Sequence, residues 1–195
     1  MNLEGILNEA LGGDTISQMS QTLGTDEGTT ANAVQTALPM LLGVMTRNSS
    51  TPEGATSLLS ALDEDHDGSV LNDLGGLLGG YDAGPGAGIL DHVFGDKLGA
   101  AQSGVSQASG LDMGRAGSLL MMLAPIVMGA LGKYRRQGRI DESSLPDVLG
   151  RATRETASNS PISDLLSGML DSNRDGSSLD DILRLAGNYF ARRGN

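Results

Sequence analysis

The apolar residues of this chain gather in segments that suit helices rather than strands. Residues 38–45 and 119–131 are apolar on nearly every side of a helix, which predicts two central helices surrounded by others. Strictly alternating apolar and polar segments, typical of half-buried strands, are absent. Helix starts are frequent: Thr51 and Pro52 combine a capping hydroxyl with a first-turn proline, and a Ser-Pro pair occurs at 160–161. The pattern predicts an all-α, multihelical fold.

Each central segment carries a proline followed four residues later by a glycine, Pro39 with Gly43 and Pro125 with Gly129. Proline inside a helix removes a backbone hydrogen bond and kinks the helix, and glycine on the same face admits a close neighbour. We therefore expect the two helices to cross at the centre of the molecule and to define a pseudo-twofold axis.

Short sequences recur along the chain in the same order. The motif at 5–12 (GILNEALG) returns at 88–95 (GILDHVFG), and the proline of the first central segment returns in the second. An acidic loop at 63–73 returns at 171–181. Three ordered matches predict a tandem duplication. The loops are spaced more widely than the other two pairs, so the second copy is longer, and we expect its additional residues to form a helix over residues 145–157.

The duplication divides the chain into two helical repeats, each with an EF-hand-like helix-loop-helix. Residues 1–80 form the first repeat with the acidic loop 63–73, and residues 89–195 form the second with the loop 171–181. Residues 81–88 form a glycine-rich linker between them. Since the two central helices are expected to pack on each other, we expect one compact unit.

Both acidic loops follow the pattern D-x-[DN]-x-D-G-S-x-L-x-D. Short oxygen-bearing side chains at alternate positions, with glycine at the sixth, are what a calcium loop requires. Position 12 departs from an EF-hand, because Leu74 and Ile182 replace the bidentate glutamate, which predicts a lower affinity. Either the carboxylate at position 11 or water must then complete the coordination. The candidate ligands are Asp63, Asp65, Asp67, Ser69, Asp73, Asp171, Asn173, Asp175, Ser177 and Asp181.

The same residues can act without a metal ion. Asp and Asn beside glycine form turns through side-chain to backbone hydrogen bonds, and Asp180 with Ser177 can cap the following helix. Against this, four carboxylates crowd into residues 63–67 and repel one another unless a cation is nearby. The second loop carries Arg174 and is the weaker metal candidate.

The net charge of -11 resides in the part of the chain before position 86, which holds 12 acidic side chains and a single basic one, Arg47. Such an acidic half repels nucleic-acid phosphates and anionic membranes, so neither is expected as a partner. The basic cluster at 133–139 follows an apolar helix, where the helix dipole favours positive charge. We interpret the cluster as a helix end rather than as a phosphate-binding patch.

Signals for membrane spanning and export are missing. The longest apolar run, 119–131, is shorter than the roughly 20 residues that a membrane helix needs. The N-terminal residues lack the basic and apolar regions of a signal peptide, so a cytoplasmic location is expected, with leaderless export left open. The chain has no cysteine, which rules out disulfides and thiolate metal sites.

The residues that usually carry catalysis are sparse. The chain has two histidines, His66 and His92, and lacks the G-x-S-x-G, H-E-x-x-H and phosphate-loop motifs. A glycosidase pair of carboxylates would need a substrate groove, normally lined by aromatic side chains, which make up 3% of the chain. We therefore expect no enzymatic activity and no small-molecule substrate.

Three segments together resemble a known family. Residues 38–45 (LPMLLGVM), 51–59 (TPEGATSLL) and 63–80, which contain the first acidic loop and end in LGGLLGG, resemble domain-of-unknown-function family 937, the YidB-like bacterial proteins. The resemblance covers most of the chain. It implies a multihelical bacterial protein and brings no assigned activity.

Two hypotheses for the function follow. In the first, a non-enzymatic protein binds Ca²⁺, or Mg²⁺ in its place, through both loops, and the ion stabilises the fold. In the second, the loops are only turns and helix caps. The glycine- and methionine-rich helices then form a scaffold that binds further copies of itself or a protein partner.

Overall fold

The computed structural model describes residues 2–79 and 83–158. The described residues are almost entirely helical and contain no strand, which confirms the all-α, multihelical prediction. The second acidic loop, 171–181, lies outside the described residues. The elements are α1 (Leu3–Ala10), α2 (Gly13–Leu23), α3 (Glu27–Asn48), α4 (Pro52–Glu64), η1 (Ser69–Asn72), α5 (Leu74–Gly79), α6 (Ala83–Phe94), η2 (Gly95–Lys97), α7 (Leu98–Ser109), α8 (Met113–Arg136) and α9 (Leu145–Ser158), where η marks a 3₁₀ helix.

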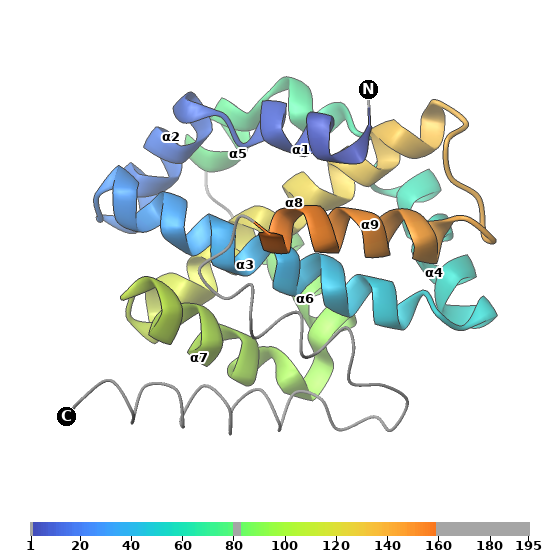
Figure 1. The fold of residues 1–195 in the computed structure, drawn as a ribbon. Coiled ribbons are helices and arrows are strands. Elements are labelled where there is room, and N and C mark those ends of the chain that lie inside the picture. The colour runs from blue at the N-terminus through green and yellow to red at the C-terminus, as the bar shows by residue number, and fades with distance from the viewer. Residues whose placement is uncertain (1, 80–82, 159–195) are drawn as a thin grey trace.

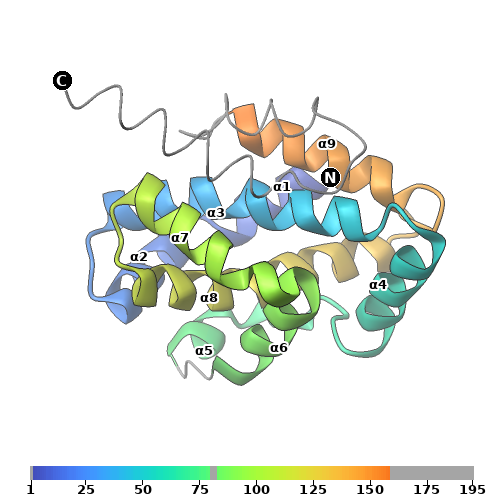
Figure 2. The same cartoon turned by 90° about the horizontal axis from the view of Figure 1, so that it is seen from below.

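The two proline-containing helices, α3 and α8, occupy the centre of the molecule (Figure 1). α3 packs most extensively against α9, and α8 against α6, while α3 and α8 also contact each other. α1, α2 and α5 lie above this centre and α7 lies below it (Figure 1). The view from below shows α7 over the neighbouring ends of α3 and α8 (Figure 2), both of which it contacts.

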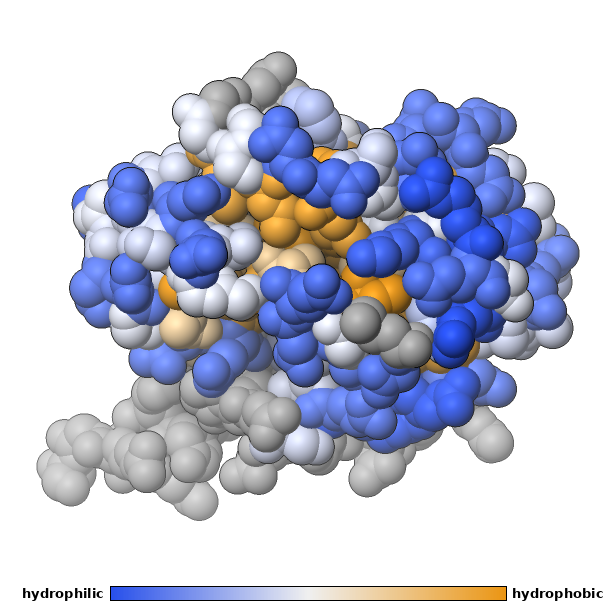
Figure 3. All heavy atoms as spheres, turned by 90° about the horizontal axis from the view of Figure 1, so that it is seen from above, coloured by the Kyte–Doolittle hydropathy of each residue, from blue (hydrophilic) through white to orange (hydrophobic). Residues whose placement is uncertain are grey.

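One face of the molecule is hollowed and apolar. Seen from above, an apolar hollow opens between α1 and α5 and is surrounded by polar side chains (Figure 3). α5 packs on α2 and η1, and partly buried leucines belong to the elements on this side: Leu11, Leu71, Leu74 and Leu77. Among the described residues, Met113 is the one large apolar side chain that is exposed, at 50%. The hollow is therefore an apolar surface that Figure 3 shows on this face of the molecule.

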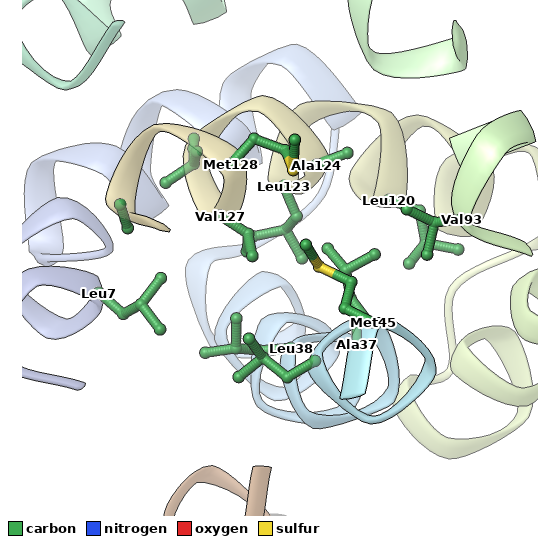
Figure 4. Close-up of a cluster of buried hydrophobic side chains, with 14 of the residues drawn as sticks. Leu7, Ala37, Leu38, Met45, Val93, Leu120, Leu123, Ala124, Val127 and Met128 are labelled. Atoms are coloured by element: carbon green, nitrogen blue, oxygen red, sulfur yellow. The ribbon is translucent and has the colours of Figure 1, made fainter. Parts of the chain in front are cut away.

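The core is aliphatic and methionine-containing, as the scarcity of aromatic residues predicts. Leu38 and Met45 of α3 point toward Leu123 and Val127 of α8 (Figure 4), and all four side chains are buried. Leu7 of α1 closes one side of the cluster. Fully burying each such side chain stabilises the fold by about 1.5–3 kcal/mol before conformational entropy is subtracted.

The two central helices correspond position by position. Adding 86 to each of the ten buried positions of α3 gives a buried position of α8. Both helices begin after an aspartate, Asp26 and Asp112, which accepts a hydrogen bond from the backbone N–H three residues later, at 2.8 and 3.0 Å. The preceding helices both end at a glycine with positive φ, Gly24 and Gly110. This correspondence is the pattern expected of the predicted internal duplication.

Several local predictions agree with the structure. Thr51 caps α4 by accepting a hydrogen bond from the N–H of Gly54 at 3.2 Å, and Pro52 is the first residue of that helix. The helix predicted from the longer second repeat is α9. Asp141 organises the turn before this helix: its carboxylate accepts hydrogen bonds from the hydroxyl of Ser143 and from the N–H and hydroxyl of Ser144, which lower its pKa to about 2.

α8 is long and apolar enough to cross a membrane by length and composition, alone among the described helices. Most of its apolar part, 83%, is buried inside the molecule. A helix covered by neighbours in this way serves as the core of a folded protein, so a membrane span is not indicated.

Two glycines of α6 test how closely that helix approaches α8. A Cβ at Gly86 would overlap the backbone carbonyl of Met121, whereas a Cβ at Gly88 would meet open space. We expect Gly86→Ala to lower the free energy of unfolding by about 1–3 kcal/mol, because α6 must move away. Gly88→Ala is the matched control and should raise it by about 0.5–1 kcal/mol. Urea unfolding followed by circular dichroism measures both, and equal stabilities would contradict the close packing.

Candidate functional site: the acidic loop

The acidic loop 63–73 connects α4 to α5 and lies against the C-terminal half of α8. Asp63 belongs to the last turn of α4, and Asp65 is the exposed residue that follows the helix. The chain then turns at Gly68, which has a φ of +86°, and enters η1. Asp73 follows η1 and precedes α5. η1 contacts α8, so the loop joins the first repeat to the central helix of the second.

The loop packs against two glycines of α8. A Cβ at Gly132 would overlap the carbonyl oxygen of His66, and a Cβ at Gly129 would overlap the side chain of Val70. On the loop side, a Cβ at Gly68 would come within 2.9 Å of the carbonyl oxygen of Gly129. Helix and loop therefore meet backbone to backbone at Gly132 and Gly68, where a larger residue would force the two apart, and backbone to side chain at Gly129.

Two arginines at the end of α8 bind the loop's carboxylates. Arg135 donates to both carboxylate oxygens of Asp63, from Nε and from Nη2, each at 3.2 Å. Its Nη1 also donates to the carbonyl oxygen of Ile140 at 2.8 Å, and the pairing with Asp63 raises its pKa. Arg136 donates from Nη1 to the Oδ2 of Asp67 at 3.0 Å. These pairs offset part of the repulsion within the acidic loop.

Two further carboxylate oxygens of the loop accept hydrogen bonds from backbone N–H groups. Oδ1 of Asp67 accepts a hydrogen bond from the N–H of Ser69 at 2.9 Å, which closes the turn. Hydrogen bonds from Ser69, together with the charge of Arg136, lower the pKa of Asp67. Oδ1 of Asp73 accepts from the N–H of Gly76 at 2.8 Å and so caps α5. Both aspartates therefore act as the metal-free hypothesis predicts.

The predicted metal ligands of this loop do not converge on one point. Asp63 and Asp67 bind different arginines, and Asp73 binds the start of α5. In residues 2–79 and 83–158, no group of three or more His, Asp or Glu side chains is placed to hold a metal ion. Calcium binding at Asp63, Asp65, Asp67, Ser69 and Asp73 stays a prediction, and it would require the arginines to release two of these side chains.

Sequence reasoning did not identify the α8 residues of this site. The opposite charges of the acidic loop and of the basic cluster 133–139 are a signal that the two could bind each other. The helix dipole alone accounts for the position of the basic cluster, so the sequence interpretation assigned it no partner. The structure adds specific partners for Arg135 and Arg136, 72 and 69 residues distant from theirs in the chain. His66, a loop residue, is half-buried, and burial lowers its pKa despite the nearby carboxylate of Asp65.

The equivalent face of α3 is covered differently. Gly43 and Thr46 correspond to Gly129 and Gly132 of α8, and α9 packs on them. A Cβ at Gly43 would lie 3.6 Å from Cγ2 of Thr153, and the hydroxyl oxygens of Thr46 and Thr153 lie 3.3 Å apart. Where α8 has three basic residues, α3 has one basic residue and two serines: Lys133, Arg135 and Arg136 correspond to Arg47, Ser49 and Ser50. α3 therefore offers no second docking place of this kind.

Fold and site together define a multihelical, all-α protein in which an acidic loop is held by arginines of a central helix. The family model described as "Bacterial protein of unknown function (DUF937)" matches residues 5–134 and 139–195. The chain belongs to this family, which confirms the resemblance seen in the sequence. Neither the curated proteins nor the solved structures contain a match to the chain.

The lowered pKa of Asp67 predicts a pH-dependent contribution to stability. A carboxyl whose native pKa lies below the unfolded value stabilises the fold above that unfolded value, 3.8, and loses the contribution as the pH falls toward the native pKa. Asp67→Asn should therefore melt at a lower temperature than the wild type near pH 7, and the difference should close in strong acid.

Asp65→Asn is the matched control, because it removes the same charge from an exposed residue of the same loop. Melting temperatures measured from neutral to acidic pH compare the two variants. If Asp65→Asn lowers the neutral-pH melting temperature as much as Asp67→Asn, the specific contacts of Asp67 contribute nothing.

Proposed function

We propose that the protein is a non-enzymatic helical scaffold that assembles with a second copy of itself through the apolar hollow between α1 and α5. The observation that carries this proposal is the hollow itself, an apolar surface with a polar rim (Figure 3). Contiguous apolar surface of this kind is typical of an interaction site. A second copy presents the same surface, and a twofold arrangement lets each copy cover the hollow of the other.

The contacts of the acidic loop support a structural role within this scaffold. Asp67 and Asp73 bind backbone N–H groups, and Asp63 and Asp67 bind arginines. The hydrogen bonds to N–H groups shape the loop and the start of α5, and the pairs with Arg135 and Arg136 hold the loop on α8. Since α5 forms one side of the hollow, the loop fixes the position of the surface that assembles.

Calcium binding by the loops is the second candidate function, and one feature of the first loop favours it. Asp63, Asp65 and Asp67 are solvent-accessible at positions 1, 3 and 5, and Gly68 makes the sharp turn at position 6 that a calcium loop requires. Ca²⁺, or Mg²⁺ in its place, would compete with Arg135 and Arg136 for two of these carboxylates. An ion bound there would stabilise the fold in proportion to its concentration above the Kd.

Assembly through the hollow predicts a concentration-dependent mass. Light scattering on the wild type should show a rise from the chain mass of 20.0 kDa toward twice that value. Leu77→Glu replaces a partly buried side chain of α5, the helix on one side of the hollow, and should remain at the chain mass because a charge there opposes burial of this side. Met113→Glu, at the exposed first residue of α8, is the control and should assemble like the wild type.

Circular dichroism and the melting temperature verify that the Leu77→Glu variant is folded. A wild type that stays at the chain mass at every concentration contradicts the assembly proposal. So does a folded Leu77→Glu variant that assembles as the wild type does.

The metal-free role of the loop predicts equal melting temperatures in calcium and in chelator. The competing hypothesis predicts a higher melting temperature in calcium, and a larger rise in the double variant Arg135→Gln/Arg136→Gln, which frees Asp63 and Asp67. Scanning calorimetry on both proteins separates the two. A calcium-dependent rise that Asp63→Asn abolishes would replace the turn-and-cap role with metal binding.

A further inference from the structure

Within residues 2–79 and 83–158, Met113 is the one methionine whose side chain is exposed. It is the first residue of α8, and the adjacent residues Asp112 and Gly114 are exposed as well. Met40 and Met121 are partly buried and pack against the core. Four further methionines are buried, with exposed fractions of 4% or less: Met19, Met45, Met122 and Met128. A dissolved reagent therefore meets the sulfur of Met113 before it meets those of the core.

The thioether of Met113 has few competitors for an oxidant, because the chain has no cysteine and no tryptophan. Hydroperoxides convert a methionine thioether to the sulfoxide. A lone pair of the sulfur attacks one oxygen of hydrogen peroxide, and the O–O bond breaks. The departing hydroxide takes the proton of the transferred oxygen and leaves as water. The sulfur loses two electrons in this step, and the peroxide gains them.

The start of α8 is a favourable place for the added oxygen. The first turn of a helix has N–H groups without acceptors inside the helix, and the helix dipole favours negative charge there. A sulfoxide oxygen carries partial negative charge and accepts hydrogen bonds. The equivalent position of α3 is Glu27, an exposed carboxylate directly after the capping residue Asp26. The first repeat thus already has oxygen acceptors at the corresponding place.

Oxidation of a core methionine would have the opposite effect. Met45 of α3 lies among aliphatic side chains of α3 and α8 (Figure 4) and is 1% exposed. A sulfoxide at this place would bury a polar oxygen among apolar side chains, which destabilises the fold. Peroxide that is consumed at Met113 leaves the core methionines intact.

We propose that Met113 is a modification site, at which a hydroperoxide oxidises the folded protein and from which a dithiol reductant removes the oxygen again. In the return step, the sulfoxide oxygen leaves as water while two thiols become a disulfide. The chain has no cysteine, so these thiols belong to another molecule. The proposal rests on the exposure and surroundings of Met113 and not on the proposed assembly.

Oxidation of the full chain by hydrogen peroxide tests the proposal. Mass spectrometry after digestion measures the fraction of sulfoxide at each methionine over time. We expect Met113 to oxidise at least about tenfold faster than Met19 and Met45. The protein oxidised at Met113 should melt at the temperature of the untreated protein. Methionine sulfoxide reductase with dithiothreitol should then restore the thioether of the folded protein.

Met113→Leu is the control variant, because leucine has a similar volume and no sulfur. At the same peroxide dose it should take up one oxygen atom fewer than the wild type. The proposal is overturned if Met19 or Met45 of the folded protein oxidises as fast as Met113. It is also overturned if oxidation at Met113 lowers the melting temperature of the wild type while treated Met113→Leu keeps its own, or if the reductase leaves the sulfoxide in place.

Discussion

The close approach of helices at glycine is the constraint on which the rest of the structure depends. With few aromatic side chains, the core is filled by short aliphatic residues, so neighbouring backbones must lie near one another. Gly86 meets the backbone of Met121, and Gly132 meets that of His66. These contacts fix α6 and the acidic loop against α8, and the position of α5 follows from that of the loop.

Charge adds specificity to this packing. The acidic loop faces the basic end of α8. Asp63 binds Arg135 there, and Asp67 binds Arg136. Exposed ion pairs contribute little to the free energy of unfolding, but several at one place favour a single register between loop and helix. Two of the twelve acidic residues before position 86 thus pair with the basic end of α8.

The local features of the fold could be predicted from the sequence, because a cap or a proline acts within a few residues. Thr51, Pro52 and the helix that became α9 are examples. The contacts of Asp63 could not be predicted, because its partner lies 72 residues away in the chain. The spacing of carboxylates in a sequence also gives no information on the direction of each side chain. The same pattern of carboxylates can bind a metal ion or pair with arginines. The directions of the side chains decide which of these occurs.

α9 has a consequence for how the chain recognises itself during folding. A chain with two similar central helices risks pairing a segment with the wrong one, within one chain or between two. Because α9 covers Gly43 and Thr46, and because serines follow Arg47 where α8 has arginines, the acidic loop of residues 63–73 fits one central helix only. The packing of α9 on α3 thereby leaves α8 as the one central helix that can receive the acidic loop.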